Sequence, residues 1–201
     1  MTSTAQAPIL TTPADRVIVI ERIFDAPRDQ VWRAWTEPAL IAQWWGRGRK
    51  TVVEQMEVKK GGHWHFVVDG KSGTQGFRGR YREITPPSRF VWTMEWDGMP
   101  GYVSIDTVEL EDLGNGKTRL INTSQFLTDE EQNAALKSGM MEGVRDAYLA
   151  LDKVLTTLWA VSSERVSSRA QQGILHRVPA STAELRSGIG SPMPGPSLRS
   201  G

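Results

Sequence analysis

Hydrophobic and polar residues alternate along much of the chain between residues 16 and 126, a pattern typical of strands with one buried face. The first such stretch, residues 16–24, reads RVIVIERIF and is rich in β-branched residues. Further strands are predicted after residue 50, separated by glycine and proline turns at hairpin spacing. Their ranges are 51–58, 63–69, 75–84, 89–96, 102–111 and 117–126. Because hairpins join antiparallel strands, the pattern predicts one antiparallel sheet of about seven strands.

Helices are predicted on either side of this run of strands. Two short ones follow the first strand, over about residues 27–35 and 38–45, and Pro27 suits a first helical turn, where no N–H is needed. A helix of about thirty residues is predicted from Thr128, because the sequence TDEE fits a capping box. Apolar residues recur along it at spacings of three and four, which indicates a buried stripe. They are Val144, Tyr148, Leu151, Leu155 and Leu158.

Both ends of the chain are predicted to lie outside the folded domain. Residues 1–14 are mostly Thr, Ala and Pro, and residues 161–201 are rich in Ser, Gly, Pro and Arg without a helical or strand period. Such compositions bury too little apolar surface to offset an ordering cost of about 1–2 kcal/mol per residue. We therefore expect disordered tails at 1–14 and 161–201 around a single domain at 15–160.

Composition excludes several classes of protein. The chain has no cysteine, which excludes disulfides and cysteine-ligated zinc, and its 24 basic residues nearly balance 23 acidic ones. The weak net charge argues against a nucleic-acid partner. No apolar run approaches the roughly 18–20 residues of a membrane helix, and the N-terminus lacks the features of a signal peptide. We expect a cytoplasmic protein without a membrane partner; its oligomeric state is left open.

The strand periods predict an inner sheet face that is unusually aromatic. Alternation places Trp64 and Phe66 on one face of their strand, and Phe77 and Tyr81 on one face of the next. The strand at 89–96 puts four large apolar residues on one face: Phe90, Trp92, Met94 and Trp96. Four of the eight tryptophans lie in the two short helices: Trp32, Trp35, Trp44 and Trp45. Such rings fill a solid core, line a ligand cavity or anchor a partner protein.

Polar residues also fall on this inner face. Asn122 and Ser124 share the phase of their apolar neighbours on the last strand. On the strand at 102–111 the apolar phase breaks, and a bulge near Asp106 would restore it, which leaves open whether this carboxyl faces inward. An acid or base inside a dry cavity would serve a cyclase-type enzyme, and the catalytic candidates are Asp106, Tyr81 and Tyr102.

Other motifs have simpler interpretations. His63 and His65 share a strand face, but the only other histidine, His176, lies in the predicted tail, so no metal site is expected. The loop GRGRK at residues 46–50 lacks the full phosphate-loop pattern and is interpreted as a solvated basic loop. Gly139 and Gly143 each cost about 1 kcal/mol inside a helix relative to alanine, which indicates close packing or space for a cavity.

The order of elements and several segments together resemble a known family. The segments are FDAP…VWRAWTEPALIAQWWG, GGHWHF, GFRGRYREITPPSRFVWTMEW and GMMEGVRDAYLALDKVL. Over about residues 16–159 the chain resembles the activator of heat-shock-protein-90 ATPase-like branch of the SRPBCC (START-like) superfamily. One departure is Arg47, which follows the WWG element where the family often has proline.

The resemblance implies an α+β helix-grip fold. A curved antiparallel sheet would grip the long C-terminal helix, with a hydrophobic cavity between them and the two short helices closing one end. It implies binding of hydrophobic small molecules and, in some members, cyclisation or dehydration of polyketides. It also implies a possible chaperone partner, although it covers only the second domain of the eukaryotic activators.

We therefore predict a protein that binds a hydrophobic or aromatic small molecule between the sheet and the C-terminal helix, without a cofactor or metal. A cyclase- or dehydratase-like enzyme is the alternative, and a chaperone cofactor is a further one. The predicted ligand-binding residues share an inward phase or a place beneath the helix. They are Trp44, Trp64, Phe66, Phe77, Tyr81, Trp92, Met94, Asn122, Ser124, Met140, Gly143 and Val144.

Overall fold

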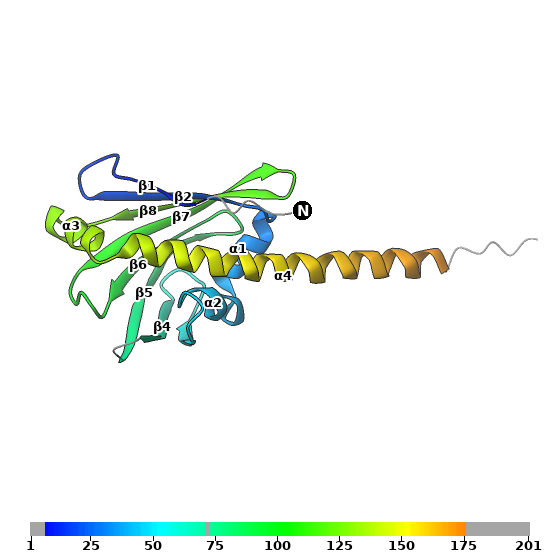
Figure 1. Cartoon of the computed structure of the whole chain (residues 1–201), viewed down its shortest axis with the longest axis horizontal. Helices are drawn as coiled ribbons and strands as arrows, with labels where there is room; N and C mark the ends of the chain where they lie inside the picture. The colour runs from blue at the N-terminus through cyan, green and yellow to red at the C-terminus, as the bar shows by residue number, and fades with distance from the viewer. Residues whose placement is uncertain (1–6, 71–72, 176–201) are drawn as a thin grey trace, which may run out of the picture. The chain divides into compact units, whose positions relative to one another are not determined.

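The computed structural model describes residues 7–70 and 73–175, and its strands form one antiparallel sheet (Figure 1). In this part of the chain the sheet has eight strands in the order β1-β2-β8-β7-β6-β5-β4-β3. The strands are β1 (Ile9–Thr11), β2 (Val17–Phe24), β3 (Thr51–Met56), β4 (His63–Gly70), β5 (Gly73–Thr85), β6 (Arg89–Trp96), β7 (Val103–Gly114) and β8 (Lys117–Gln125). The helices are α1 (Arg28–Thr36), α2 (Pro38–Trp44), α3 (Asp129–Lys137) and α4 (Met140–Leu175).

Helix α4 crosses one face of the sheet, as the helix-grip prediction requires (Figure 1). Its predicted apolar stripe is confirmed, because Tyr148, Leu151 and Leu155 are buried and Val144 is half-buried. Helices α1 and α2 follow β2, where two short helices were predicted. The α+β architecture predicted from the alternation and the resemblance is therefore confirmed.

The N-terminal segment contributes an edge strand, which corrects the prediction of a disordered tail over residues 1–14. Strand β1 pairs antiparallel with β2, with Leu10 opposite Ile20. Three residues are too few to show a period in the sequence, so this strand was not predicted. Residues 1–6 lie outside the described residues.

The predicted single helix from Thr128 is two helices. The capping box is present: the Glu131 N–H donates to Thr128 Oγ1 at 3.2 Å, and Glu131 Oε2 accepts from the Thr128 N–H. However, Gly139 has φ +78°, a left-handed conformation that ends α3 and precedes α4. Glycine adopts this conformation without the Cβ clash that other residues suffer, so Gly139 is a break and not a helix-interior residue.

Helix α4 continues to Leu175, past residue 160 where the sequence analysis ended the domain. Residues 161–175 are thus helical where a disordered tail was predicted, and the segment does contain good helix formers such as Glu, Arg, Ala and Gln. The described residues up to 164 form one compact unit, and residues 165–175 belong to a second. Residues 176–201, also predicted to be disordered, lie outside the described residues. None of the described helices combines the length and hydropathy needed to cross a bilayer.

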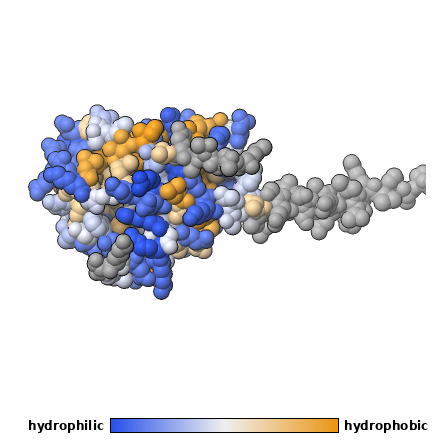
Figure 2. Space-filling view, in the orientation of Figure 1, coloured by the Kyte–Doolittle hydropathy of each residue, from blue (hydrophilic) through white to orange (hydrophobic). Residues whose placement is uncertain are grey.

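The core is built from the aromatic face that the alternation predicted. Trp64 and Phe66 are fully buried on β4, and Trp92 stacks on Trp64 with ring centroids 4.4 Å apart. A buried aromatic side chain removes about 150–250 Å² from water, so each ring stabilises the fold by up to roughly 4–6 kcal/mol. Large apolar side chains that remain exposed come from several elements, and Figure 2 shows hydrophobic residues gathered along the upper part of the visible face.

A charged pair is also buried against the sheet. Arg22 on β2 points inward, is 4% exposed, and its Nη2 donates to Asp152 Oδ2 of α4 at 2.5 Å. The guanidinium also lies 4.7 Å from the centroid of the Phe24 ring, which adds a cation–π contact. This pair joins β2 of the sheet to α4.

Candidate functional site

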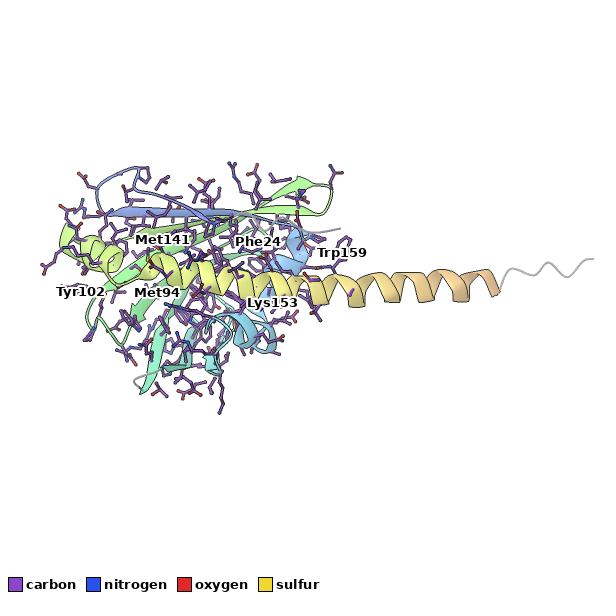
Figure 3. The ribbon with its side chains drawn as sticks, in the orientation of Figure 1. Phe24, Met94, Tyr102, Met141, Lys153 and Trp159 are labelled. Atoms are coloured by element: carbon purple, nitrogen blue, oxygen red, sulfur yellow. The ribbon has the colours of Figure 1, made fainter. Side chains whose placement is uncertain are left out.

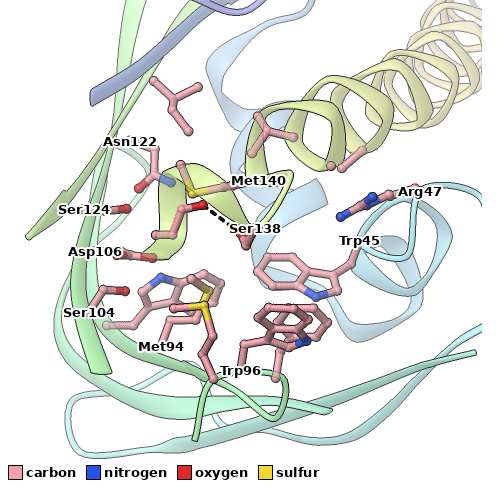
Figure 4. Close-up of a pocket in the computed structure, with 18 of the residues that line it drawn as sticks. Trp45, Arg47, Met94, Trp96, Ser104, Asp106, Asn122, Ser124, Ser138 and Met140 are labelled. Atoms are coloured by element: carbon pink, nitrogen blue, oxygen red, sulfur yellow. Dashed lines mark hydrogen bonds between the residues drawn. The ribbon is translucent and has the colours of Figure 1, made fainter. Parts of the chain in front are cut away.

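A cavity of about 220 Å³ lies between the sheet and the helices α3 and α4 (Figure 4). Met94 and Tyr102 both line it and lie toward the α3 end of the sheet, whereas Trp159 lies at the other end (Figure 3). An engineered cavity of about 150 Å³ holds benzene, and drug-sized ligands occupy roughly 300 Å³ or more. The cavity therefore suits a molecule of one or two rings.

Aromatic rings form most of its apolar wall. They come from the two short helices, the loop after them, and the strands β5 and β6: Trp35, Trp44, Trp45, Phe77, Trp92 and Trp96. This arrangement explains why Trp35, Trp44 and Trp45 lie so close together in the sequence. Trp35 and Trp44 are buried with centroids 4.7 Å apart, and the half-buried Trp45 faces the cavity, so these rings serve the core and the cavity wall.

Most of the predicted ligand-binding residues do line this cavity. They are Trp44, Phe77, Trp92, Met94, Asn122, Ser124, Met140, Gly143 and Val144. Three others, Trp64, Phe66 and Tyr81, are buried in the core beside it and do not line it.

Trp45 separates Trp64 and Phe66 from the cavity. Its ring lies against both of theirs, with centroids 5.9 Å from Trp64 and 5.3 Å from Phe66, and fills the space that they would otherwise face. Tyr81 packs against Trp92 with centroids 5.7 Å apart. Alternation therefore identified the inner face correctly, but it does not say which inward residues adjoin open space.

One end of the cavity is polar. Asp106 and Ser104 of β7 lie beside Ser124 and Asn122 of β8, and the close-up view shows all four along the same wall (Figure 4). Asp106 pairs in register with Ser124 and with Trp92 across its two neighbouring strands. It is 2% exposed. Four polar groups here have no hydrogen-bond partner within the described chain: Asp106 Oδ1, Ser104 Oγ, Asn122 Oδ1 and Trp92 Nε1.

The predicted bulge near Asp106 is wrong. The pairing of β7 runs without a shift from Val103 to Glu109 along β6 and from Ile105 to Asp112 along β8, and the irregularity lies between Asp112 and Gly114. Ser104, Asp106, Val108 and Leu110 all point inward. The apolar phase breaks because two polar residues occupy inward positions. The break marks the polar end of the cavity and not a distortion of the strand.

Burial controls the acidity of Asp106. Desolvation raises its pKa from 3.8 to about 6, and the neighbouring Ser104, Ser124 and Trp92 partly offset this rise. The carboxyl therefore titrates close to neutral pH, inside an otherwise apolar cavity. Such a group accepts a hydrogen bond from a ligand when ionised and exchanges a proton readily.

The two tyrosine candidates are placed less favourably. The Tyr81 hydroxyl is buried without a hydrogen-bond partner in the described chain, burial raises its pKa, and it does not line the cavity. Tyr102 lines the cavity, but its hydroxyl lies 3.4 Å from Glu130 Oε1, and the charge of Glu130 raises its pKa. Of the three predicted catalytic residues, only Asp106 presents a buried ionisable group to the cavity.

Several residues that line the cavity were not predicted from the sequence. Ser104, Tyr148 and Arg47 are the most informative, together with Trp45, which was not assigned to it. The inward phase of Ser104 follows from a bulge-free strand, and Tyr148 belongs to the predicted helix stripe. No strand phase or helix periodicity indicated Arg47, because its position depends on a loop conformation with φ +60°.

The histidine pair, His63 and His65, lies on β4. His65 Nδ1 lies 2.9 Å from Glu54 Oε2 on the neighbouring strand. Among the residues that the structure describes, no three His, Asp or Glu side chains are grouped as ligands for one ion.

The sheet, the long helix and the cavity between them define a helix-grip protein of the START-like (SRPBCC) class. The model of the family "Activator of Hsp90 ATPase homolog 1-like protein" matches residues 25–156, well over half of the chain. The chain belongs to this family, as the resemblance in its sequence indicated. No curated protein is significantly similar to it.

Solved structures of several bacterial proteins are similar in fold. A crystal structure of a Rhodobacter sphaeroides protein is 29% identical, covers 75% of this chain and 99% of its own, and has a TM-score of 0.68. A solution structure of an Arthrobacter aurescens protein is 25% identical, with coverages of 74% and 91% and a TM-score of 0.67. A Mycobacterium smegmatis protein is 18% identical, with coverages of 73% and 97% and a TM-score of 0.65.

Proposed function

We propose that this protein binds a small aromatic molecule in the cavity, with a hydrogen-bond donor of that molecule directed at Asp106. The observation that carries the proposal is the combination of an aromatic wall with one buried polar end, where Asp106 Oδ1 and Asn122 Oδ1 have no hydrogen-bond partner in the described chain. A buried carboxylate oxygen without a hydrogen-bond partner, such as Asp106 Oδ1, is costly, and a ligand hydroxyl or N–H that reaches it removes much of that cost. The volume of about 220 Å³ sets the ligand at one or two rings.

Calorimetric titration with 2-naphthol tests this proposal. We expect a Kd below about 100 µM, because ~11 non-hydrogen atoms at roughly 0.5 kcal/mol each give about −5.5 kcal/mol. Val144→Phe places a larger side chain in the cavity and should weaken binding at least tenfold. Leu149→Phe, on the exposed face of the same helix, is the matched control and should bind as the wild type does. No binding by the wild type, or equal binding by Val144→Phe, contradicts the proposal.

A second candidate function is proton transfer by a cyclase- or dehydratase-like enzyme, favoured by the pKa of Asp106 near 6. In this function the ionised carboxylate takes a proton from a carbon next to a carbonyl, and the resulting enolate takes a proton back from the carboxyl. A positioned general base contributes about 10²–10⁴-fold to such a rate.

Deuterium exchange into 2-tetralone at neutral pH, followed by NMR, tests this second function. We expect the wild type to exchange the C1 protons at least tenfold faster than Asp106→Asn, and the rate to fall below pH ~6 as the carboxylate is protonated. Asp69→Asn, an exposed carboxyl on β4, is the control. Equal rates for the wild type and Asp106→Asn would exclude Asp106 as a base.

A further inference from the structure

Arg47 lies at the rim of the cavity, in the loop that follows α2. Its backbone N–H donates to the Trp44 carbonyl at 3.0 Å, and its φ of +60° turns the chain sharply after Trp45. The side chain lines the cavity and approaches it from the side opposite Asp106 (Figure 4). It is the only lysine or arginine among the lining residues.

The guanidinium of Arg47 rests against α4 at Gly143. A Cβ built on Gly143 would lie 2.7 Å from Arg47 Cζ, so a larger residue there would displace the guanidinium from its present position. Gly143 is buried inside a helix, its φ is not in the left-handed range and alanine would be more stable there, which fits close contact with the guanidinium. Burial lowers the pKa of Arg47, and the charge of Arg49 adds to this effect, while Asp146 and Glu142 oppose it.

Arg47 has no ion-pair partner among the described residues, since no carboxylate comes within 4.0 Å of its guanidinium. Several other arginines in the described part of the chain do form ion pairs, among them Arg22, Arg33, Arg78, Arg89 and Arg119. A partly covered, unpaired guanidinium beside an aromatic cavity is placed to bind an anionic group.

We propose that the molecule bound in this cavity is a small aromatic acid whose carboxylate pairs with Arg47 at the rim. This inference rests on the proposed function, since it requires the ring to occupy the cavity. A guanidinium forms two parallel hydrogen bonds with a carboxylate, a geometry that also orients the ring. Arg47 is the one cation in the cavity lining. A single positive charge matches a carboxylate, which carries one negative charge, better than it matches a phosphate. The buried Asp106 across the cavity disfavours placing the anion at that end.

Titration of the full chain with 2-naphthoate and 2-naphthamide at pH 7.5 and low salt tests the inference. The two probes have nearly the same shape and differ in charge. We expect 2-naphthoate to bind at least tenfold tighter than 2-naphthamide to the wild type. In Arg47→Gln the ratio of the two affinities should fall to about one, while Lys50→Gln, which removes a charge from the same loop but not from the cavity lining, should keep the wild-type ratio.

Gly143→Ala provides a second, independent variant. Its methyl group displaces the guanidinium from α4, so the preference for 2-naphthoate should fall although Arg47 is still present. Alanine favours the helix by about 1 kcal/mol, so this variant should melt at the wild-type temperature or above. Loss of preference without loss of stability separates an effect on binding from a failure to fold.

The results of these titrations distinguish a failure of the proposed role of Arg47 from a failure of the proposed function. If 2-naphthamide binds the wild type as tightly as 2-naphthoate, or if Arg47→Gln keeps the preference, the role of Arg47 is overturned and the proposed function stands. An equal loss in Lys50→Gln would assign the effect to the general charge of the loop and also overturns it. If neither probe binds, nor 2-naphthol, the proposed function itself fails.

Discussion

The free energy of unfolding of Asp106→Asn, compared with that of the wild type, should rise by about 2–3 kcal/mol between pH 4 and pH 8. The folded-state pKa of Asp106 is about 6, above the ordinary 3.8, so the folded protein binds more protons than the unfolded chain between these values. Stability of the wild type therefore falls as pH rises from about 4 to 6 and stays lower above it. The difference of about two pKa units corresponds to roughly 3 kcal/mol, which the neutral asparagine avoids.

Urea denaturation of both proteins between pH 4 and pH 8 measures this effect. The exposed Asp69→Asn is the control, and we expect it to change stability by less than ~0.5 kcal/mol across the range. A constant difference between the wild type and Asp106→Asn over these pH values would show that the carboxyl is not perturbed by burial.

The second large effect concerns the buried ion pair between the sheet and α4. Asp152→Ala should lower the free energy of unfolding by about 3 kcal/mol, because it leaves the Arg22 guanidinium buried without its carboxylate. Two nitrogens of Arg22 already have no hydrogen-bond partner in the described chain, so no other group compensates. Thermal and urea unfolding measure the loss.

A double variant distinguishes the lost partner from lost packing. Replacing both residues, Arg22→Met with Asp152→Leu, should restore most of the stability, because apolar residues need no ionic partner. Arg33→Ala, which breaks an exposed pair with Glu37 on α1, should cost less than about 1 kcal/mol. A loss in Asp152→Ala no larger than that of Arg33→Ala would refute this account of the buried pair.

Much of the fold could be predicted from the sequence because strand alternation is a long-range regularity. The faces of β4 and β6 were read correctly from Trp64 and Trp92. The missed features are local and short. Strand β1 has too few residues to show a period, and Gly139 looks like any helix glycine until its φ of +78° is known.

The cavity was less predictable than the fold. Periodicity assigns Tyr81 and Phe77 to one face, but only packing decides that Phe77 lines the cavity while Tyr81 is buried in the core. The polar end was misread as a bulge because Asp106 breaks an apolar pattern. Arg47 depends on a loop turn and on a glycine about a hundred positions away in sequence, and neither is visible as a local pattern.

The position of Asp106 also has an evolutionary consequence. An ionised carboxylate in this wall lowers the stability of the fold, and single substitutions to asparagine or serine would relieve it. Drift alone would remove such a residue from a lineage that no longer used the cavity. Relatives that keep an acid at this position are therefore those in which selection still acts on the cavity, and they are the ones in which to look for a shared natural ligand.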